Sequence, residues 1–186
     1  MIIYYCDGST RGGKNQKGAD NIGGWGVTCF YVDDEGHLLH SFDCESCCGT
    51  TNNREELKAF IYCLSHAQSN YSGETVTIRS DSSYVVNIWN SWISGWAAKG
   101  WKNSKGSTVE NLDLVQEIYK YYENNYFDYN VEKVDGHCGE LGNEMADALA
   151  TQKFKRFMSL CEENDIRLEE LDYMWIERQM TKFKEI

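Results

Sequence analysis

The sequence predicts a mixed α/β fold in which a β-hairpin is followed by alternating strands and helices. Three observations predict it. Short apolar runs separated by turn signals open the chain, a helical period begins near residue 53, and strand-like alternation returns at residues 75–80. Elements in this order build a sheet layered with helices. The 186 residues, 41% of them hydrophobic, suffice for one such domain with an appendage.

The predicted strands are rich in aromatic, β-branched and cysteine residues, and they span Ile2–Cys6, Trp25–Val32, Leu38–Cys48, Thr75–Ser80 and Tyr129–Val134. We expect Asp7-Gly8-Ser9 to end the first strand and the glycine-rich residues 11–24 to form a loop. Acidic residues and a glycine at 33–36 form a turn signal, so the second and third strands are predicted to be a hairpin.

The predicted helices cover residues 53–68, 82–94, 109–124 and 142–155. In the first of them, apolar residues recur at i, i+3, i+4 and i+7, which places them on one helical face: Leu57, Phe60, Ile61 and Leu64. Asn52 or Asn53 is expected to cap this helix, because a short polar side chain can accept a free backbone N–H of the first turn.

The last part of the chain, residues 156–186, repeats no earlier pattern and fits one or two amphipathic helices. We therefore predict a domain over residues 1–155 and a helical C-terminal extension over residues 156–186. The extension is expected to pack on the domain. Docking of a protein partner is the competing interpretation, and the sequence identifies no such partner.

The composition constrains location and partners. No stretch of about 18 apolar residues occurs, so no membrane span is expected. Eight cysteines without a secretory signal favour a reducing, cytoplasmic location. The formal net charge of −11 disfavours a polyanionic partner. However, basic residues gather locally, in one glycine-rich stretch (Arg11, Lys14, Lys17) and in another (Lys99, Lys102, Lys105).

Four acidic residues stand at strand ends or in helices where a sheet could gather them: Asp7, Glu56, Asp81 and Asp147. Carboxylates held close together repel one another unless a cation neutralises them. Mg²⁺ prefers such oxygen ligands, and a pair of metal ions can clamp the attacking and leaving oxygens of a phosphate displacement. The competing interpretation is that these are ordinary turn and helix-start acids.

The neighbouring residues add specificity. Asp7-Gly8-Ser9, TTNNREEL at 50–57, SDSSYV at 80–85 and GHCGELGNEMAD at 136–147 resemble the type 1 ribonuclease H family in order and spacing, and the resemblance covers about residues 1–152. It implies a ribonuclease H-like fold, with a five-stranded mixed sheet of order 3-2-1-4-5 and helices on both faces. It also implies hydrolysis of the RNA strand of RNA–DNA hybrids, with Asp7, Glu56, Asp81 and Asp147 holding two Mg²⁺ ions; Mn²⁺ is an alternative.

Other residues in the same motifs carry expected roles. The family motif places its ligand immediately before the leucine, which selects Glu56. Since adjacent helical residues point about 100° apart, Glu55 is expected to be a solvated first-turn acid. The resemblance assigns His137 to proton transfer or product release, for which an imidazole is suited. Glu144, one turn before Asp147, is a candidate auxiliary metal contact.

Substrate contacts are also expected by resemblance. The predicted set comprises Gly8, Ser9, Asn52, Asn53, Ser83, Trp96, Lys99 and Lys102, with Lys14 and Lys17 as auxiliary phosphate contacts. Sugar recognition matters because only the 2′-hydroxyl separates RNA from DNA at a given position. Residues 92–102 resemble the basic handle of many family members, but Ala97 and Ala98 stand where relatives carry positive charge. Its tryptophans are expected to pack the handle against its helix rather than stack on bases.

The spacing of His37, His40, Cys44 and Cys47 resembles that of zinc ligands. Side chains alternate faces along a strand, so the four cannot easily converge, and we do not expect zinc.

Two other functions compete with ribonuclease H activity. One is a non-catalytic hybrid-binding domain, against which the complete carboxylate set argues. The other is a different nuclease of the same superfamily, which would lack the TTNNREEL and GHCGELGNEMAD segments.

Overall fold

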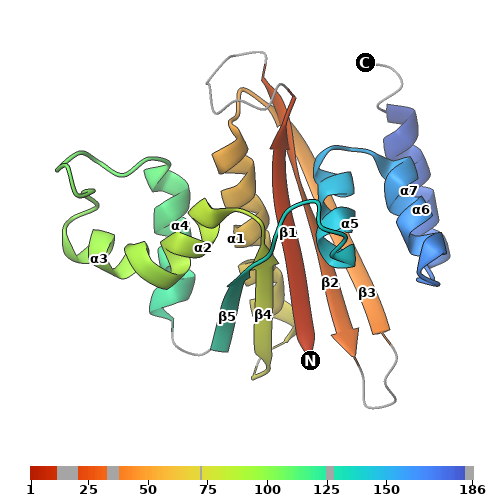
Figure 1. Ribbon diagram of the computed structural model, residues 1–186, viewed down its shortest axis with the longest axis horizontal. Helices are drawn as coiled ribbons and strands as arrows, with labels where there is room; N and C mark the ends of the chain where they lie inside the picture. Colours follow the sequence, from red (N-terminus) through yellow and green to blue (C-terminus); the bar gives the residue numbers. More distant parts are fainter. Residues whose placement is uncertain (12–20, 33–37, 72, 125–127, 183–186) are drawn as a thin grey trace.

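The computed structural model describes residues 1–11, 21–32, 38–71, 73–124 and 128–182. Its centre is a five-stranded sheet of order β3-β2-β1-β4-β5, which confirms the predicted topology (Figure 1). The strands are β1 (Ile2–Thr10), β2 (Ile22–Val32), β3 (Leu38–Cys48), β4 (Thr75–Ser80) and β5 (Asp128–Lys133). The β1–β2 and β2–β3 pairs are antiparallel, and the β1–β4 and β4–β5 pairs are parallel.

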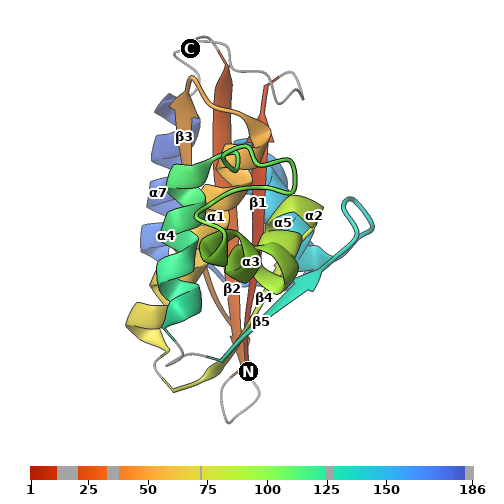
Figure 2. The ribbon, with the colours of Figure 1, turned by 90° about the vertical axis from the view of Figure 1, so that its left-hand side faces the viewer.

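Helices cover both faces of the sheet, as predicted (Figures 1 and 2). They are α1 (Asn52–Asn70), α2 (Ser83–Asn87), a π-helical turn η1 (Ile88–Trp92), α3 (Ile93–Ala98), α4 (Leu112–Glu123), α5 (Leu141–Ala150), α6 (Phe154–Glu163) and α7 (Glu170–Lys182). One core lies between the sheet and α1, α2 and α4. A second lies between the sheet and α5, α6 and α7.

The alternation of side chains along β1 produces these two cores. Ile2, Tyr4 and Cys6 belong to the core beneath α1, and Tyr5 belongs to the core beneath α5. Successive strand residues point to opposite faces, so a strand that is apolar at consecutive positions must be covered on both sides. The first strand of the sequence is therefore the central strand of the sheet.

Strand β1 ends later than predicted, and strand β2 begins earlier than predicted. Asp7-Gly8-Ser9 was expected to end the first strand, but β1 continues to Thr10, because its antiparallel pairing with β2 persists through Thr10↔Gly23. Gly23 and Gly24 were expected in a loop, but they lie in β2. Side chains there would collide, since a Cβ on Gly23 would lie 2.5 Å from Thr50 Cγ2 and 2.9 Å from Ser9 O.

Two helix predictions are wrong, and a third is confirmed with a local distortion. Neither asparagine caps α1; Thr51 does, with an extended backbone and an Oγ1 that accepts the Arg54 N–H at 3.4 Å. The helix expected at 82–94 contains the π turn, where Ile93 N–H donates to Ile88 O. The helix expected to reach residue 155 ends at Ala150, because Gln152 is left-handed (φ 59°).

The last two helices lie against the second core. Phe42 of β3 contacts Phe157 of α6 and Trp175 of α7, with ring centroids 4.7 Å and 5.7 Å apart. Phe157 and Ile176 are fully buried. Residues after 155 therefore include an amphipathic helix pair whose apolar side faces the rest of the chain.

Among the described residues, no helix combines the length and the apolar character needed to cross a lipid bilayer.

Candidate active site

The site begins where two parallel strands stop pairing. The last β1–β4 pair is Cys6↔Ser80, but β1 runs on to Thr10. Asp7 and Asp81 are the next residues after that pair on the two strands, so their carboxylates meet beside the open edge of β1. Parallel strands gather such residues at their carboxyl ends.

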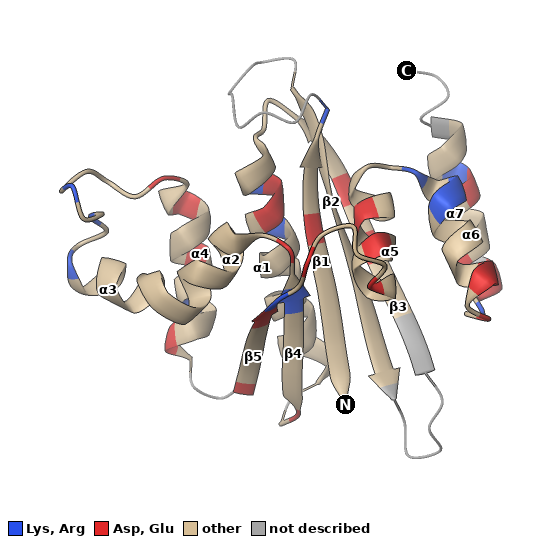
Figure 3. Cartoon of the chain, in the orientation of Figure 1, with Lys and Arg blue, Asp and Glu red and all other residues tan. Residues whose placement is uncertain are grey.

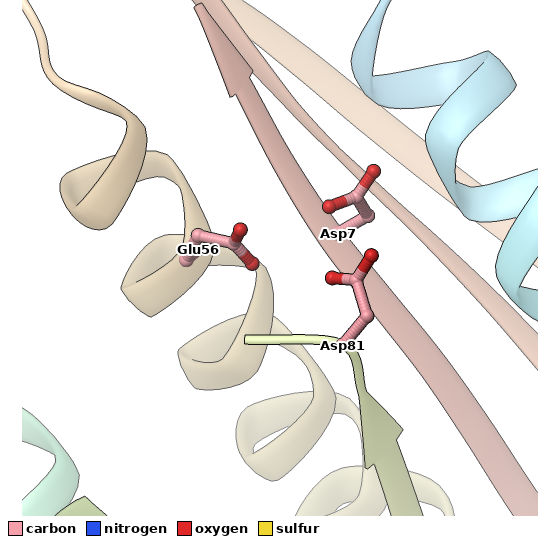
Figure 4. A group of neighbouring side chains, drawn as sticks. All are labelled: Asp7, Glu56 and Asp81. Atoms are coloured by element: carbon pink, nitrogen blue, oxygen red, sulfur yellow. The ribbon is translucent and has the colours of Figure 1, made fainter. Parts of the chain in front are cut away.

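Glycine brings α1 to the same point. A Cβ on Gly8 would lie 2.1 Å from Glu56 N, a distance that only glycine permits. The first turn of α1 therefore rests directly on β1, and Glu56 points toward Asp7 and Asp81 (Figure 4). Carboxylate oxygens of Asp7, Glu56 and Asp81 lie within 4.8 Å of one another.

The fourth carboxylate comes from α5 by a similar close approach. A Cβ on Gly26 of β2 would lie 2.4 Å from Ala146 O, and one on Gly24 would lie 2.8 Å from Ala150 O. The helix can thus lie close to the sheet along its second half, which carries Asp147. Asp147 is not among the three carboxylates whose oxygens lie mutually within 4.8 Å in the described residues. It lies close enough to Asp7 that its charge, after burial and the charge of Asp81, raises the pKa of the Asp7 carboxyl group.

Two of these carboxylates are buried, and Asp81 and Asp147 are half-buried, without a compensating cation among the described residues. Asp7 is 7% exposed and Glu56 is 5% exposed. Burial, followed by the charges of Asp81 and Asp147, raises the pKa of Asp7 well above 3.8. Burial, followed by the charges of Asp7 and Asp81, raises the pKa of Glu56 well above 4.5. The N–H of Gly8, 2.8 Å from Asp7 Oδ1, offsets only part of this effect.

The donor set fits a divalent cation. Glu56 Oε2 is buried and has no hydrogen-bond partner, while Glu56 Oε1 accepts a 3.2 Å hydrogen bond from the Asn52 amide. Clustered carboxylate oxygens are the ligands that hard cations prefer. A cation would relieve the repulsion and satisfy the unpaired oxygen together.

The prediction that Glu55 is a solvated acid is wrong, because Glu55 is fully buried. Its Oε1 accepts hydrogen bonds from Thr50 Oγ1 at 2.5 Å and Lys58 Nζ at 2.8 Å. It faces β3, where the Cys47 thiol lies 3.3 Å away. The 100° turn between adjacent helical residues thus places Glu55 and Glu56 in separate clusters, as expected. The i,i+3 spacing of Glu55 and Lys58 was the available signal for the missed ion pair.

The loop with His137 lies over Asp81. A Cβ on Gly136 would lie 2.5 Å from Asp81 Oδ2, so the loop backbone touches the carboxylate and places the next residue beside the cluster. His137 adopts a left-handed conformation (φ 55°). Glu144 is half-buried one turn before Asp147, but it is not among the mutually close carboxylates found in the described residues.

The expected sugar contacts lie near this cluster. Gly8 and Ser9 follow Asp7 in β1, and Asn52 and Asn53 form the first turn of α1. Ser83 is exposed at the first position of α2, after the Ser82 cap. Their contacts with a hybrid remain predictions.

The handle projects away from the sheet on the side opposite α6 and α7 (Figure 1). Trp96 is partly buried and lies 5.4 Å from Trp92 between ring centroids, and Trp101 lies 5.3 Å from Tyr119. Trp96 and Trp101 therefore pack within the protein, whereas Trp92 is exposed. Lys99 and Lys102 are exposed there, away from the carboxylates. Lys14 and Lys17 lie outside the described residues.

Cys44 and Cys47 lie on opposite faces of β3. Cys47 contacts Glu55 and Lys58, whereas Cys44 packs on the core beneath α5. These two thiols cannot share a metal ion. The turn at 33–36, His37 and the side chain of His40 lie outside the described residues.

A mixed sheet of this order with a buried carboxylate cluster at its centre defines a class of metal-dependent nucleases. A family model for RNase H matches residues 1–155. The chain is 39% identical to Ribonuclease H of Ruthia magnifica subsp. Calyptogena magnifica, over 80% of this chain and 92% of that protein. It is 36% identical to Ribonuclease H of Alcanivorax borkumensis, over 81% and 89%.

Solved structures agree. The crystal structure of LC9-RNase H1, a type 1 RNase H with the type 2 active-site motif, superposes with a TM-score of 0.69 at 31% identity, over 81% of this chain and 70% of that one. The chain belongs to the ribonuclease H family. Its activity is that of the family, hydrolysis of the RNA strand of RNA–DNA hybrids.

LC11-RNase H1, solved in complex with RNA/DNA hybrid, shares the fold with a TM-score of 0.54 at 20% identity, over 82% of this chain and 95% of that one.

Proposed function

We propose that the chain cuts the RNA strand internally, leaving a 5′-phosphate, with two Mg²⁺ ions held by Asp7, Glu56, Asp81 and Asp147. The observation that supports this most strongly is the buried carboxylate cluster, in which three side chains bring oxygens within 4.8 Å without a compensating cation. Such a cluster costs stability unless it holds metal. Mn²⁺ can substitute in the same oxygen site.

When bound, the two ions would activate the attacking water and stabilise the leaving oxygen. The chain's own residues hold this arrangement in place. The charges of Asp81 and Asp147 both act on Asp7, so it is the residue best placed to serve both ions. Asn52 orients Glu56 through its 3.2 Å hydrogen bond. His137, beside Asp81, is suited to move a proton to the departing 3′ oxygen. Glu144 would act on water around the ions rather than as a direct ligand.

We further propose that the first turn of α1 and the backbone at Gly8 and Ser9 recognise the RNA strand. These groups lie within one turn or two residues of a metal-binding carboxylate. Amide groups of Asn52 and Asn53 can donate to and accept from a 2′-hydroxyl, which duplex DNA lacks. Ser83 and the exposed Lys99 and Lys102 would contact the hybrid farther from the cut.

We propose residues 1–155 as the catalytic domain and residues 156–186 as an extension packed on it through α6 and α7. The contact of Phe42 with Phe157 and Trp175 supports this division. Truncation after Lys155 should then lower stability while retaining catalysis by the folded fraction. A cytoplasmic location fits the eight cysteines, all of which are free.

Labelled RNA–DNA hybrid, duplex RNA and duplex DNA, each with Mg²⁺ or chelator, test the function. The chain should cut only the RNA of the hybrid, only with metal, and leave 5′-phosphate ends. Asp81→Asn should abolish cleavage. Asp128→Asn is the matched control, because Asp128 is exposed at the opposite end of the strands.

The other outcomes are equally informative. Hybrid binding without cleavage by the unaltered chain would indicate a non-catalytic binding domain. Cleavage of duplex DNA would indicate a different nuclease of the superfamily.

A further inference from the structure

An open pocket of about 240 Å³ lies next to the carboxylate cluster, on the α5 side of the sheet. It is formed where β1 ends and the chain passes from α5 to α6. The lining includes Ser9, Arg11, Gly24, Thr151, Gln152 and Lys153. None of the roles proposed above uses Lys153 or the pocket itself.

The shape of the pocket follows from two backbone features. Gly24 lacks a side chain that would collide with Ala150 O, so the end of α5 lies directly on the hairpin. Helix α5 then ends in a left-handed turn, in which the N–H of Lys153 donates to Ala148 O at 2.7 Å and that of Gln152 donates to Leu149 O at 3.0 Å. This double closure is a common, well-defined helix end. It fixes the start of Lys153 at the rim of the pocket.

The charge of the pocket is opposite to that of its surroundings. Of the described residues that line it, two are cationic, Arg11 and Lys153, and none is acidic. Both are exposed, and neither forms an ion pair within the described part of the chain. Figure 3 shows red around the site on β1, α1 and α5, and blue where β1 ends and where α5 leads to α6. In a chain of net charge −11, two unpaired cations beside one cavity point to an anionic ligand.

The position of the pocket indicates which anion. Ser9 lies two residues beyond Asp7 on the same face of β1, about 7 Å farther along the strand. Ser9 and Thr151 add hydroxyl groups, and Gln152 adds an amide, to the cationic rim. A phosphate next to the reacting phosphate on the same strand is the anion closest to the metal site.

We propose that this pocket binds a backbone phosphate of the RNA strand adjacent to the scissile one, with Lys153 and Arg11 as its charged partners. The inference rests on the proposed function. It gives the acidic chain a local means of holding its substrate, in addition to the remote handle, and it sets the register of the RNA strand relative to the carboxylates.

Kinetics of Lys153→Gln and Arg11→Gln on hybrid test the proposal, with Lys155→Gln as the matched control. Lys155 is also exposed, lies two residues away and does not line the pocket. Each pocket variant should raise KM about three- to tenfold at unchanged kcat. It should also reduce the steepness of the plot of the logarithm of the binding constant against the logarithm of the salt concentration by about one. Lys155→Gln should change neither.

A chemical substitution locates the contact. Hybrids carry one uncharged methylphosphonate on a 2′-deoxynucleotide at successive positions of the RNA strand, beside controls with the same deoxynucleotide and an ordinary phosphate. The unaltered chain should bind more weakly when the methylphosphonate replaces one particular phosphate next to the cut. The same replacement should not weaken hybrid binding by Lys153→Gln any further. Equal losses in both proteins at every linkage would overturn the proposal.

Hybrid binding by fluorescence anisotropy is measured in parallel. If the unaltered chain binds hybrid without cutting it, the proposed function fails while the pocket remains tested by binding. If the chain cuts hybrid normally and Lys153→Gln matches Lys155→Gln, the pocket inference alone fails.

Discussion

Glu55 and Glu56 are adjacent, both buried, and opposite in their surroundings. Glu55 has the ammonium group of Lys58 at 2.8 Å and the hydroxyl of Thr50 at 2.5 Å. Glu56 instead faces Asp7 and Asp81 and forms no ion pair within the described part of the chain. Oε2 of each glutamate lacks a hydrogen-bond partner, so the two residues differ in charge compensation. Lys58 neutralises the charge of Glu55, whereas the charge of Glu56 is available to a bound metal ion. The comparison teaches that burial alone does not identify a metal ligand, whereas burial without compensation does.

The largest expected effect comes from removing a charge on the uncompensated side. Asp7→Asn should lower kcat by more than about 100-fold, because loss of an outer contact to a metal ligand already costs 10- to 100-fold. The same change should raise the free energy of unfolding in chelator by about 1 kcal/mol, since it removes repulsion. Hybrid cleavage assays and urea unfolding measure the two effects.

Asp128→Asn should change neither quantity. If Asp7→Asn lowered both activity and metal-free stability, the residue would be a structural partner like Glu55, and the contrast between the clusters would disappear.

On the compensated side, Lys58→Met should lower the free energy of unfolding by about 2–4 kcal/mol, because it leaves the Glu55 carboxylate buried beside a hydroxyl and a thiol. Cleavage by the folded protein should be unchanged. The double variant Glu55→Met/Lys58→Met should recover most of the loss, since it removes both charges. A double variant as unstable as Lys58→Met would show that the ion pair does not explain the burial of Glu55.

The smallest expected effect is a pH dependence of the metal-free protein. The pKa values of Asp7 and Glu56 are raised above 3.8 and 4.5, so the folded chain keeps protons that the unfolded chain has lost. Their contribution to stability is complete below about pH 4 and is lost as the pH rises through the raised pKa values. Stability in chelator should thus fall by about 1 kcal/mol or more over this range. Saturating Mg²⁺ should abolish the decline, and Asp7→Asn should reduce it.

Periodicity predicted most of the strands and helices, and the position of Asp7, Glu56 and Asp81 at element ends suggested that they cluster. The sheet order followed from the resemblance of the motifs to the ribonuclease H family. Sequence reasoning missed the continuation of β1 through Asp7-Gly8-Ser9. Glycine there is required by the approach of α1 to within 2.1 Å of a Cβ, a contact between elements far apart in sequence. Local turn statistics contain no information about that contact.

The burial of Glu55 and the pocket beside Lys153 also depend on contacts between elements far apart in sequence, so local patterns did not predict them. Burial of Glu55 depends on Cys47 and Thr50 covering the start of α1, and a helical wheel cannot report what lies beyond the helix. Lys153 reaches the pocket only because α5 ends in a left-handed turn at Gln152. That residue is not glycine, so the usual sequence signal for a helix end is missing.

Calorimetric titration of Mg²⁺ into the unaltered chain, Glu55→Gln and Glu56→Gln tests the central claim most directly. The account predicts that Glu55→Gln binds Mg²⁺ like the unaltered chain and that Glu56→Gln binds it at least about tenfold more weakly. Equal binding by all three proteins, or equal weakening in both variants, would contradict it.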